Sequence, residues 1–249
     1  MRGVPCFPSV GKLPQPVDLA IIVTPPKTVP GVIEECGQFG IRAAVVITAG
    51  FSEVGGEGAE LERALLAAAR RHRVRVLGPN CLGLMRPPLG LNATFARGNA
   101  LPGSLALLSQ SGAVCTALLD WATPSGIGFS SVISLGGSSE LDFGEVIDYL
   151  AADPKTEHIL LYVEGVRDGR RFVSSLRAAA RVKPVILMKV GRHPEGSRER
   201  SQPSVAVRGS FQAVGSARTA RLVRSQSSSL SSRWEVQPPS SSSSSRSWR

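Results

Sequence analysis

The chain has 249 residues, of which 42% are hydrophobic, and a formal net charge of +10. This size and composition allow one large or two ordinary globular domains with a sizeable core. No apolar run reaches the roughly 18 residues that span a bilayer, and the first residues do not form a secretory signal. We therefore expect a cytoplasmic protein with no membrane partner.

Short apolar strands alternate with helices in the first third of the chain. Residues 17–24 are too continuously apolar for a strand with one solvent-exposed face. This favours a buried parallel strand that stops at Pro25. It is followed by a helix over 29–39 that closes at Gly40, a strand over 43–48, a helix over 58–72 and a strand over 74–77. The pattern predicts a doubly wound, Rossmann-like α/β unit over residues 1–86.

The alternation restarts after an interruption. Residues 84–103 contain Pro87, Pro88 and several glycines with little periodicity, so we expect a linker, placed at 87–103. After it come strands over 105–108, 129–134, 158–163 and 185–189, alternating with helices over 113–123, 143–152 and 170–181. This is the pattern of a flavodoxin-like domain, which we predict over residues 104–196.

The composition changes after Gly191. Residues 201–249 hold seven Arg, one Glu and no Lys or Asp, so +6 of the net charge lies there, and 17 of these 49 residues are Ser. The remaining apolar residues follow no helical or strand period, so they cannot form a core. We predict a disordered tail over residues 197–249.

Small and polar residues follow the predicted strands. In an open parallel sheet the carboxyl ends of the strands share one edge, and ligands bind there. The turns are Thr24-Pro25-Pro26, Thr48-Ala49-Gly50, Pro79-Asn80-Cys81, Ser109-Gln110-Ser111-Gly112, Gly136-Gly137 and Glu164-Gly165. Taken singly, each is explained equally well by turn-forming residues, but six in register favour a ligand-binding edge. Residues 109–112 open a helix, whose unpaired N–H groups predict a phosphate site.

Few side chains have a catalytic setting. Glu164 follows a very apolar strand, where it could orient or deprotonate a histidine or simply end the strand in solvent. His72 and His158 lack catalytic neighbours, and His193 lies in a loop where a reactive histidine could sit. The turn at 167–171, Arg-Asp-Gly-Arg-Arg, either binds phosphate or is solvated.

The cysteines and acidic residues indicate no metal. Cys81 and Cys115 can be read as nucleophiles, although small buried thiols are far more common. The four cysteines of the chain are widely spaced, with no CxxC pair, so we expect reduced thiols. Asp142 stands near other carboxylates, yet a helix N-cap explains it more simply than a divalent cation. We predict no metal site.

These motifs resemble those of the α-subunit of succinyl-CoA synthetase and, more closely, the corresponding part of the ADP-forming (NDP-forming) acyl-CoA synthetases and their protein-acetyltransferase relatives. The resemblance covers about residues 3–196. It implies a first domain that binds CoA and a second that holds an acyl phosphate site and a transiently phosphorylated loop histidine. The residues it places in the CoA groove are Thr24, Pro25, Pro26, Ile47, Thr48, Ala49 and Asn80. It also implies that Ser109, Gln110, Ser111 and Gly112 hold phosphate and that Glu164 is catalytic, in contact with the phosphohistidine.

The chain departs from the family pattern in two places. The family's opening strand and glycine-rich loop, which wrap the CoA phosphates, would precede residue 1. A Ser-His-Thr-Gly or Gly-His-Ala-Gly loop is expected after Gly196, where Ser197-Arg198-Glu199-Arg200 stands instead. We hypothesise a shifted reading frame there, or a mispredicted fragment. A shifted frame predicts that one of the other two frames, translated beyond codon 197, contains a His-Thr-Gly or His-Ala-Gly loop. The family's ATP-grasp domain, through which ATP, ADP and Mg would act, is also absent, so we expect such a domain or subunit as a partner.

The leading prediction is therefore the CoA-binding and ligase-like core of an NDP-forming acyl-CoA synthetase, without turnover of its own. One alternative is the regulatory CoA-binding-like core of a protein lysine acetyltransferase. Another is a basic nucleic-acid-binding protein that uses the Arg/Ser tail, but the tail has few aromatic residues beyond Trp234 and Trp248, so we do not expect nucleic acid as a partner. The sequence does not identify the acyl group of the substrate. Thr116 stands where the succinate-using relatives have a tyrosine.

Overall fold

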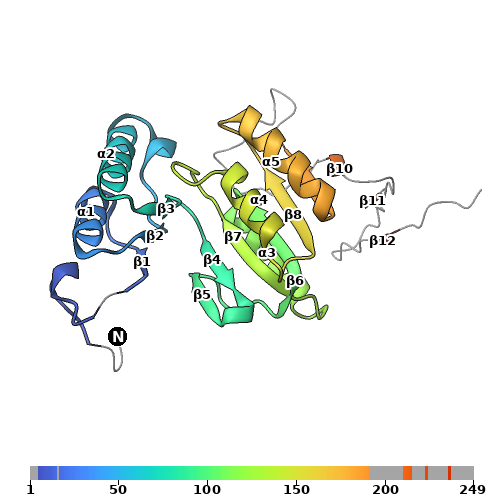
Figure 1. The fold of residues 1–249 in the computed structure, drawn as a ribbon, viewed down its shortest axis with the longest axis horizontal. Coiled ribbons are helices and arrows are strands. Elements are labelled where there is room, and N and C mark those ends of the chain that lie inside the picture. The colour runs from blue at the N-terminus through green and yellow to red at the C-terminus, as the bar shows by residue number, and fades with distance from the viewer. Residues whose placement is uncertain (1–4, 16, 191–209, 215–221, 224–234, 237–249) are drawn as a thin grey trace, which may run out of the picture.

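A computed structural model of the chain describes residues 5–15, 17–190, 210–214, 222–223 and 235–236. Two α/β units lie side by side, the first at the left of Figure 1 and the second at its centre. Within these ranges no helix is long and apolar enough to cross a bilayer. The α/β class and the order of a Rossmann-like unit before a flavodoxin-like one are as the sequence predicts.

The first unit is built on a three-stranded parallel sheet in the order β1-β2-β3. Its elements are η1 (Val10–Lys12), β1 (Leu19–Ile22), η2 (Pro26–Thr28), α1 (Val29–Phe39), β2 (Ala43–Val46), η3 (Ser52–Val54), α2 (Gly56–His72) and β3 (Arg75–Leu77). The helix α1 ends as expected at Gly40, whose left-handed backbone (φ 96°) suits glycine.

Both helices of this unit cover the same face of the sheet, so the prediction that it is doubly wound is wrong for the described residues (Figure 1). The cause is the strand order: two successive right-handed crossovers that advance in one direction place both helices on one side. Ile33 of α1 and Leu65 of α2 pack together with Val46 in one buried cluster. The opposite face, with Val45 and Leu77, instead packs into the core of the second unit.

The second unit contains a seven-stranded sheet in the order β10-β9-β8-β6-β7-β4-β5. Strands β6 to β9 are parallel, and β4, β5 and β10 run antiparallel to their neighbours. Its elements are β4 (Gly83–Arg86), η4 (Pro87–Leu89), β5 (Leu91–Thr94), β6 (Pro102–Ser109), α3 (Gly112–Ala122), β7 (Phe129–Ser134), α4 (Phe143–Ala152), β8 (His158–Val163), α5 (Gly169–Val182), β9 (Val185–Lys189) and β10 (Ser210–Val214).

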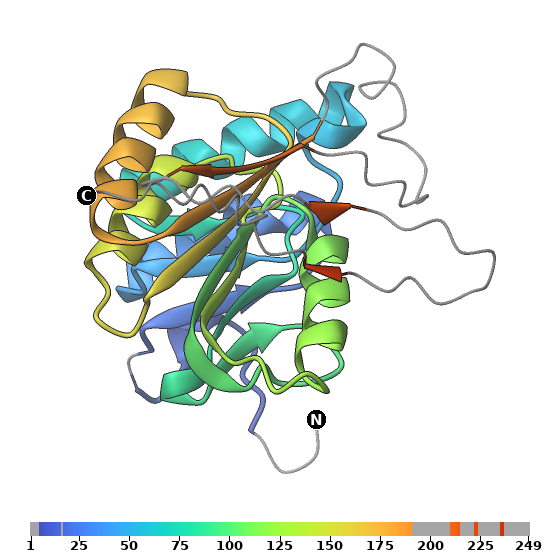
Figure 2. The same ribbon diagram turned by 90° about the vertical axis from the view of Figure 1, so that its right-hand side faces the viewer.

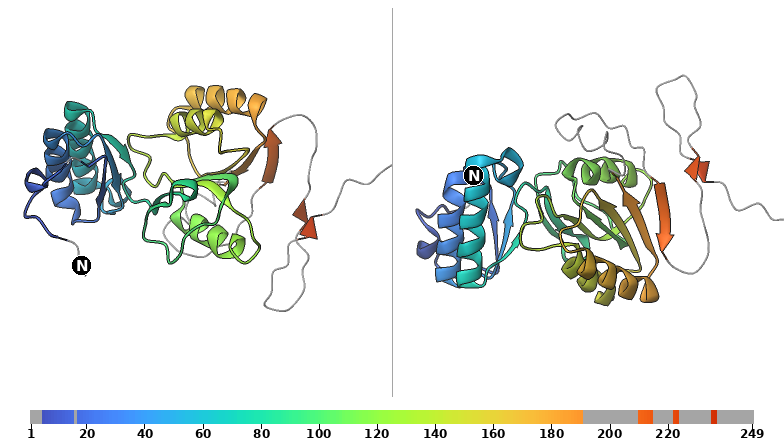
Figure 3. Two further views of the ribbon diagram at one scale, coloured as in Figure 1. Left: turned by 60° about the horizontal axis from the view of Figure 1, so that its bottom comes forward. Right: turned by 90° about the horizontal axis from the view of Figure 1, so that it is seen from above.

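Helices cover both faces of this second sheet. Helix α3 lies on one face and α4 and α5 on the other, as Figures 2 and 3 show. Cys115 and Leu119 of α3 pack with Leu107 on the first face, while Ile147 of α4 and Leu176 of α5 pack into the main core on the second. The arrangement is the doubly wound one expected of a flavodoxin-like domain.

The segment expected to be an excursion and linker is part of this sheet. Strands β4 and β5 form a hairpin around η4, and β4 pairs antiparallel with β7 through Leu84 and Met85. Met85 is buried and Leu84 is half-buried against the main core, so the hairpin extends the hydrophobic core. The prolines 87 and 88 interrupt the pattern only at the hairpin turn, where no ladder hydrogen bond is lost.

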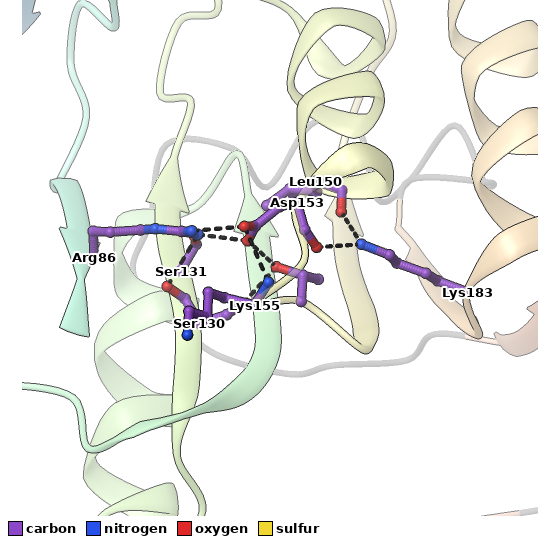
Figure 4. Close-up of polar contacts among 8 residues, drawn as sticks. Arg86, Ser130, Ser131, Leu150, Asp153, Lys155 and Lys183 are labelled. Atoms are coloured by element: carbon purple, nitrogen blue, oxygen red, sulfur yellow. Dashed lines mark hydrogen bonds and ion pairs between the residues drawn. The ribbon is translucent and has the colours of Figure 1, made fainter. Parts of the chain in front are cut away.

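A buried ion pair fastens the hairpin to the rest of the sheet (Figure 4). The Arg86 guanidinium donates to both carboxylate oxygens of Asp153, at 2.6 and 2.7 Å, and to Ser131 Oγ at 2.7 Å. Thr156 Oγ1 donates to the same carboxylate at 2.7 Å. The side chains of Arg86 and Asp153 are only 13% and 4% exposed. Because Asp153 follows α4 and Arg86 ends β4, the pair joins two elements that are distant in the sequence.

The C-terminal prediction falls almost wholly outside the described residues, as do His193 and the segment at 197–200. Within the predicted tail the structure describes β10, which pairs antiparallel with β9, and the two-residue strands β11 (Leu222–Val223) and β12 (Glu235–Val236), which pair with each other. The composition of this segment gives no sign of these short strand pairings.

Candidate functional site

The loops that follow β1, β2 and β3 are joined by hydrogen bonds at one edge of the first sheet. Thr48 Oγ1 donates to the carbonyl oxygen of Thr24 at 2.7 Å, and the amide of Asn80 donates to the carbonyl oxygen of Thr48 at 3.0 Å. Pro26 packs against Gly50, where an added Cβ would lie 3.0 Å from its ring. All seven residues implied in CoA binding thus belong to three touching loops, and Thr24, Pro25, Ala49 and Asn80 are exposed.

The turn after β3 also contacts the second unit. The amide of Gly137, in the loop after β7, donates to the carbonyl oxygen of Pro79 at 2.7 Å. At Gly136 an added Cβ would lie 2.3 Å from the carbonyl oxygen of Asn80, and the residue has φ 55°, so only glycine fits there without displacement. The tight approach holds the candidate CoA loops directly against the loop that follows β7.

Leu82, two residues after Asn80, contacts the candidate phosphate loop. The Leu82 amide donates to Ser134 Oγ at 3.1 Å, and Gly112, the first residue of α3, lies against the Leu82 side chain. Ser111 caps α3, because its Oγ accepts from the Val114 amide at 3.3 Å. Ser109 is buried and bonds both to the amide and to the carbonyl of Ser111, which fixes the turn that opens the helix.

Gln110 connects this loop to the candidate catalytic residue. Its Oε1 accepts from the amides of Glu164 and Gly165, at 2.7 and 2.9 Å. The Lys189 ammonium donates to the Glu164 carbonyl oxygen at 2.7 Å, so the backbone of Glu164 is held from both sides. Burial, together with the nearby Glu164 charge, raises the pKa of Tyr162 above its usual value. The structure therefore brings Glu164 beside the loop at 109–112.

A pocket of about 230 Å³ opens next to these residues. Its polar wall comes from Gln110, Ser138 and Arg167, and its apolar wall from Phe143 and Phe172, whose rings meet edge to face at 5.7 Å. The pocket lies beyond the carboxyl ends of β6, β7 and β8, where ligands bind in sheets of this kind.

A second polar cluster at this edge was not anticipated from the sequence. Glu62 of α2 is 6% exposed, and its carboxylate accepts from the Ser52 amide at 3.1 Å, from Ser139 Oγ at 2.7 Å and from Arg167 Nη2 at 3.3 Å. Burial alone would raise the pKa of Glu62, but these hydrogen bonds outweigh it and hold the pKa below its usual value. Arg167 was noted only as part of a basic turn, and nothing in the Ala- and Leu-rich stretch around Glu62 distinguishes it.

The remaining candidates have structural explanations. Burial raises the pKa of Cys81 and of Cys115 to about 12, which leaves neither thiol ionised near neutral pH. Asp142 caps α4 by accepting from the Glu145 amide at 3.2 Å, as predicted. His72 lies half-buried, 3.4 Å from Glu34, and His158 begins β8. The described residues contain no group of His, Cys, Asp and Glu side chains that could hold a metal ion.

Family models match both units. The model described as succinyl-CoA ligase like flavodoxin domain matches residues 102–229, and the one described as CoA binding domain matches residues 1–87. The first match continues beyond residue 196, where we expected that domain to end.

Similar proteins and structures carry related names. The protein named acetate–CoA ligase (ADP-forming) I from Archaeoglobus fulgidus is 48% identical over 215 residues, 86% of this chain and 31% of that protein. The α subunit of acetate–CoA ligase (ADP-forming) I from Pyrococcus furiosus is 41% identical over 209 residues, 84% of this chain and 45% of that subunit. A solved structure of acetyl-coenzyme A synthetase 1 from Ca. Korarchaeum cryptofilum, in complex with phosphate and ADP, superposes with a TM-score of 0.75 at 41% identity. That match covers 80% of this chain and 43% of the other, so the chain spans less than half the length of these proteins.

Proposed function

Because this chain belongs to the family of ADP-forming acyl-CoA synthetases, we propose that it supplies the part of such an enzyme that binds CoA and handles the acyl phosphate. The intact enzyme would interconvert acyl-CoA, phosphate and ADP with the free acid, CoA and ATP. The chain by itself is proposed not to turn over, since nucleotide chemistry requires an ATP-grasp domain or subunit as partner.

The three joined loops of the first unit are the proposed CoA groove. The Thr48 hydroxyl donates to the Thr24 carbonyl oxygen and the Asn80 amide donates to the Thr48 carbonyl oxygen, so these three residues keep a fixed spacing before a ligand arrives. A prearranged surface of this kind loses little conformational entropy on binding. The match of residues 1–87 to a CoA binding domain supports this assignment.

The loop at 109–112 is the proposed phosphate site. In the direction that makes ATP, a phosphate oxygen attacks the thioester carbonyl of acyl-CoA, the carbon–sulfur bond breaks, and CoA leaves as the thiolate, giving acyl phosphate. The Ser111 hydroxyl caps the Val114 amide, so the amides of Gly112 and Ala113 are the groups at the start of α3 that would stabilise the phosphate charge. Glu164, whose backbone is fixed by Gln110, would then orient the histidine that accepts the phosphoryl group.

One observation carries this proposal. The five residues from Gly78 to Leu82 contact the candidate CoA loop through Asn80 and the start of the phosphate helix through Leu82. A thioester bound by the first unit and a phosphate bound by the second would therefore meet at this short segment. Such proximity is what the attack of phosphate on a bound thioester requires.

Calorimetric titration of CoA and acetyl-CoA tests the proposal. The chain would be compared with a version extended at its N-terminus by the opening strand and glycine-rich loop of the family pattern. We expect saturable binding, tighter in the extended version, and its loss in Asn80→Trp, since a large side chain on this exposed turn would fill the groove. Absence of binding in both versions would refute the proposal.

The alternatives make different predictions. A regulatory acetyltransferase core would bind acetyl-CoA yet show no affinity for inorganic phosphate at residues 109–112. A nucleic-acid-binding protein would retain a salt-dependent affinity for RNA or DNA that disappears when residues 201–249 are deleted. The ligase names of the relatives favour the first proposal.

A further inference from the structure

Arg167 lies where the two units meet and has partners from both. Its guanidinium donates to Glu62 Oε1 of the first unit at 3.3 Å and to the carbonyl oxygens of Gly137 and Ser139 of the second, each at 3.2 Å. Arg167 stands three residues after Glu164 and lines the pocket beside Gln110. A shift of this guanidinium would therefore displace the loop that carries Glu164.

One path runs from the candidate CoA loops to Arg167 through Glu62. The loop that carries Ala49 continues into η3, where the Ser52 amide donates to Glu62 Oε2. Helix α2 packs very closely on this segment, because a Cβ at Gly58 would lie 2.0 Å from the Phe51 carbonyl oxygen. Close packing of this kind makes the loop and the helix move together. Displacement of the loop by a ligand must then displace the Glu62 carboxylate.

A second path reaches Arg167 through the turn after β3. The carbonyl oxygen of Pro79 accepts from the Gly137 amide at 2.7 Å, and that of Gly78 accepts from the Ser139 amide at 3.2 Å. Gly137 and Ser139 in turn present their own carbonyl oxygens to Arg167. Both paths start at residues of the proposed CoA groove or beside them, and both end at the same guanidinium.

We propose that Glu62 and Arg167 are a positioning pair that couples ligand binding at the CoA loops to the geometry of residues 164–168 and the phosphate loop. This inference rests on the proposed function, because it presupposes a CoA site in the first unit and a phosphate site in the second. Neither residue touches the reacting atoms; each acts by fixing the loop that carries Glu164.

The chemistry of the pair suits this role. A glutamate that is almost fully buried is costly to desolvate unless its oxygens are paired, and here both oxygens have donors on elements of different units. The Arg167 side chain is 52% exposed and its three hydrogen bonds are at the long end of the normal range. The Glu62 carboxylate is thus held firmly, whereas the Arg167 guanidinium can adjust its position. A contact that transmits a displacement between the two units needs both properties.

The test measures CoA affinity of the full chain by calorimetry, with and without saturating inorganic phosphate. In the unaltered chain we expect phosphate to change the CoA dissociation constant by at least about fivefold, and CoA to change the phosphate constant by the same factor. Glu62→Gln should bring this coupling factor close to one while each ligand alone binds within about twofold of its original affinity. Glu60→Gln is the matched control on the same helix, because its side chain is 73% exposed.

Arg167→Lys is the second variant, since it keeps the charge but loses the planar fork, and its exposed position tolerates the change. It too should lower the coupling factor toward one, and it decides the matter if Glu62→Gln does not fold. An unchanged factor in both variants, or no coupling in the unaltered chain, would overturn the inference and leave the proposed function intact. Failure of CoA to bind at all would instead overturn the proposed function, and the inference with it.

Discussion

The ion pair between Arg86 and Asp153 allows a stability prediction with a definite size. Removing the carboxylate by Asp153→Ala leaves the Arg86 charge with its side chain only 13% exposed and without its counter-ion. An exposed pair would be worth less than about 1 kcal/mol, whereas breaking a buried one costs about 3–5 kcal/mol. The exposure of 4% at Asp153 places this pair in the second class. We expect the free energy of unfolding to fall by about 3–5 kcal/mol.

The pH dependence gives the prediction a second signature. Hydrogen bonds from Arg86 hold the pKa of Asp153 well below its usual value of 3.8. A carboxyl group whose pKa is lowered on folding stabilises the protein fully above its unfolded pKa, and that stabilisation is lost as the pH falls toward the folded pKa. The difference in stability between the unaltered chain and Asp153→Asn should therefore be largest near neutral pH and shrink below about pH 4.

Urea unfolding followed by circular dichroism measures these differences. The double variant Arg86→Met with Asp153→Leu is the control, because it removes both charges and should regain at least half of the loss. A loss below about 1 kcal/mol in Asp153→Ala, or a double variant no more stable than the single one, would refute the reasoning that an uncompensated buried charge is the cause.

Three further predictions concern the site and the thiols. Gln110→Glu keeps the two backbone hydrogen bonds that the side chain accepts but adds negative charge beside the loop, so calorimetry should show phosphate affinity falling at least about tenfold; unchanged affinity would contradict a phosphate site there. Gly136→Ala should lower the free energy of unfolding by about 2–5 kcal/mol, because strained backbone and a clash act together, whereas Gly90→Ala, with a similar φ of 66° but open space around it, should cost only about 1–2 kcal/mol; equal losses would mean that the clash is relieved. Cys81 and Cys115, each with a pKa near 12, should resist a thiol reagent at about pH 8 until the chain is unfolded by urea, and rapid labelling of either in the folded chain would show that its burial is incomplete.

Local sequence signals predicted well those helices and strands that are bounded by caps or turn residues. Helix α1 ends at a left-handed Gly40, and α4 begins at the Asp142 cap, so the boundaries at 29–39 and 143–152 are as expected. The strands at 158–163 and 185–189 are short, mainly apolar runs, and they begin and end as predicted, as does the strand at 129–134. Periodicity and caps are properties of neighbouring residues, which a single sequence displays directly.

Features that depend on distant partners were missed for the same reason. The hairpin of β4 and β5 is stabilised by pairing with β7, which lies some fifty residues away in the sequence. Its own alternation of apolar and polar residues is too short to predict strands. The contact between Glu62 and Arg167 joins residues 105 positions apart. Glu62 looks like any helical glutamate until the second unit is packed against it. A single sequence does not show which residues that are far apart in the chain contact each other in the folded protein.

The hairpin has a consequence for dividing the chain into fragments. A fragment beginning at residue 104 would leave β7 as an open edge strand, with Val132 and Ile133 exposed along an unpaired ladder, and such edges promote self-association. A cut just before Cys81 keeps the seven-stranded sheet whole, but it removes the face of the first sheet, with Val45 and Leu77, that packs into the core of the second unit. The border of the proposed CoA groove therefore differs from the border of the folding unit, because Asn80 belongs to that proposed groove and β4, which begins only three residues later, belongs to the sheet of the second unit.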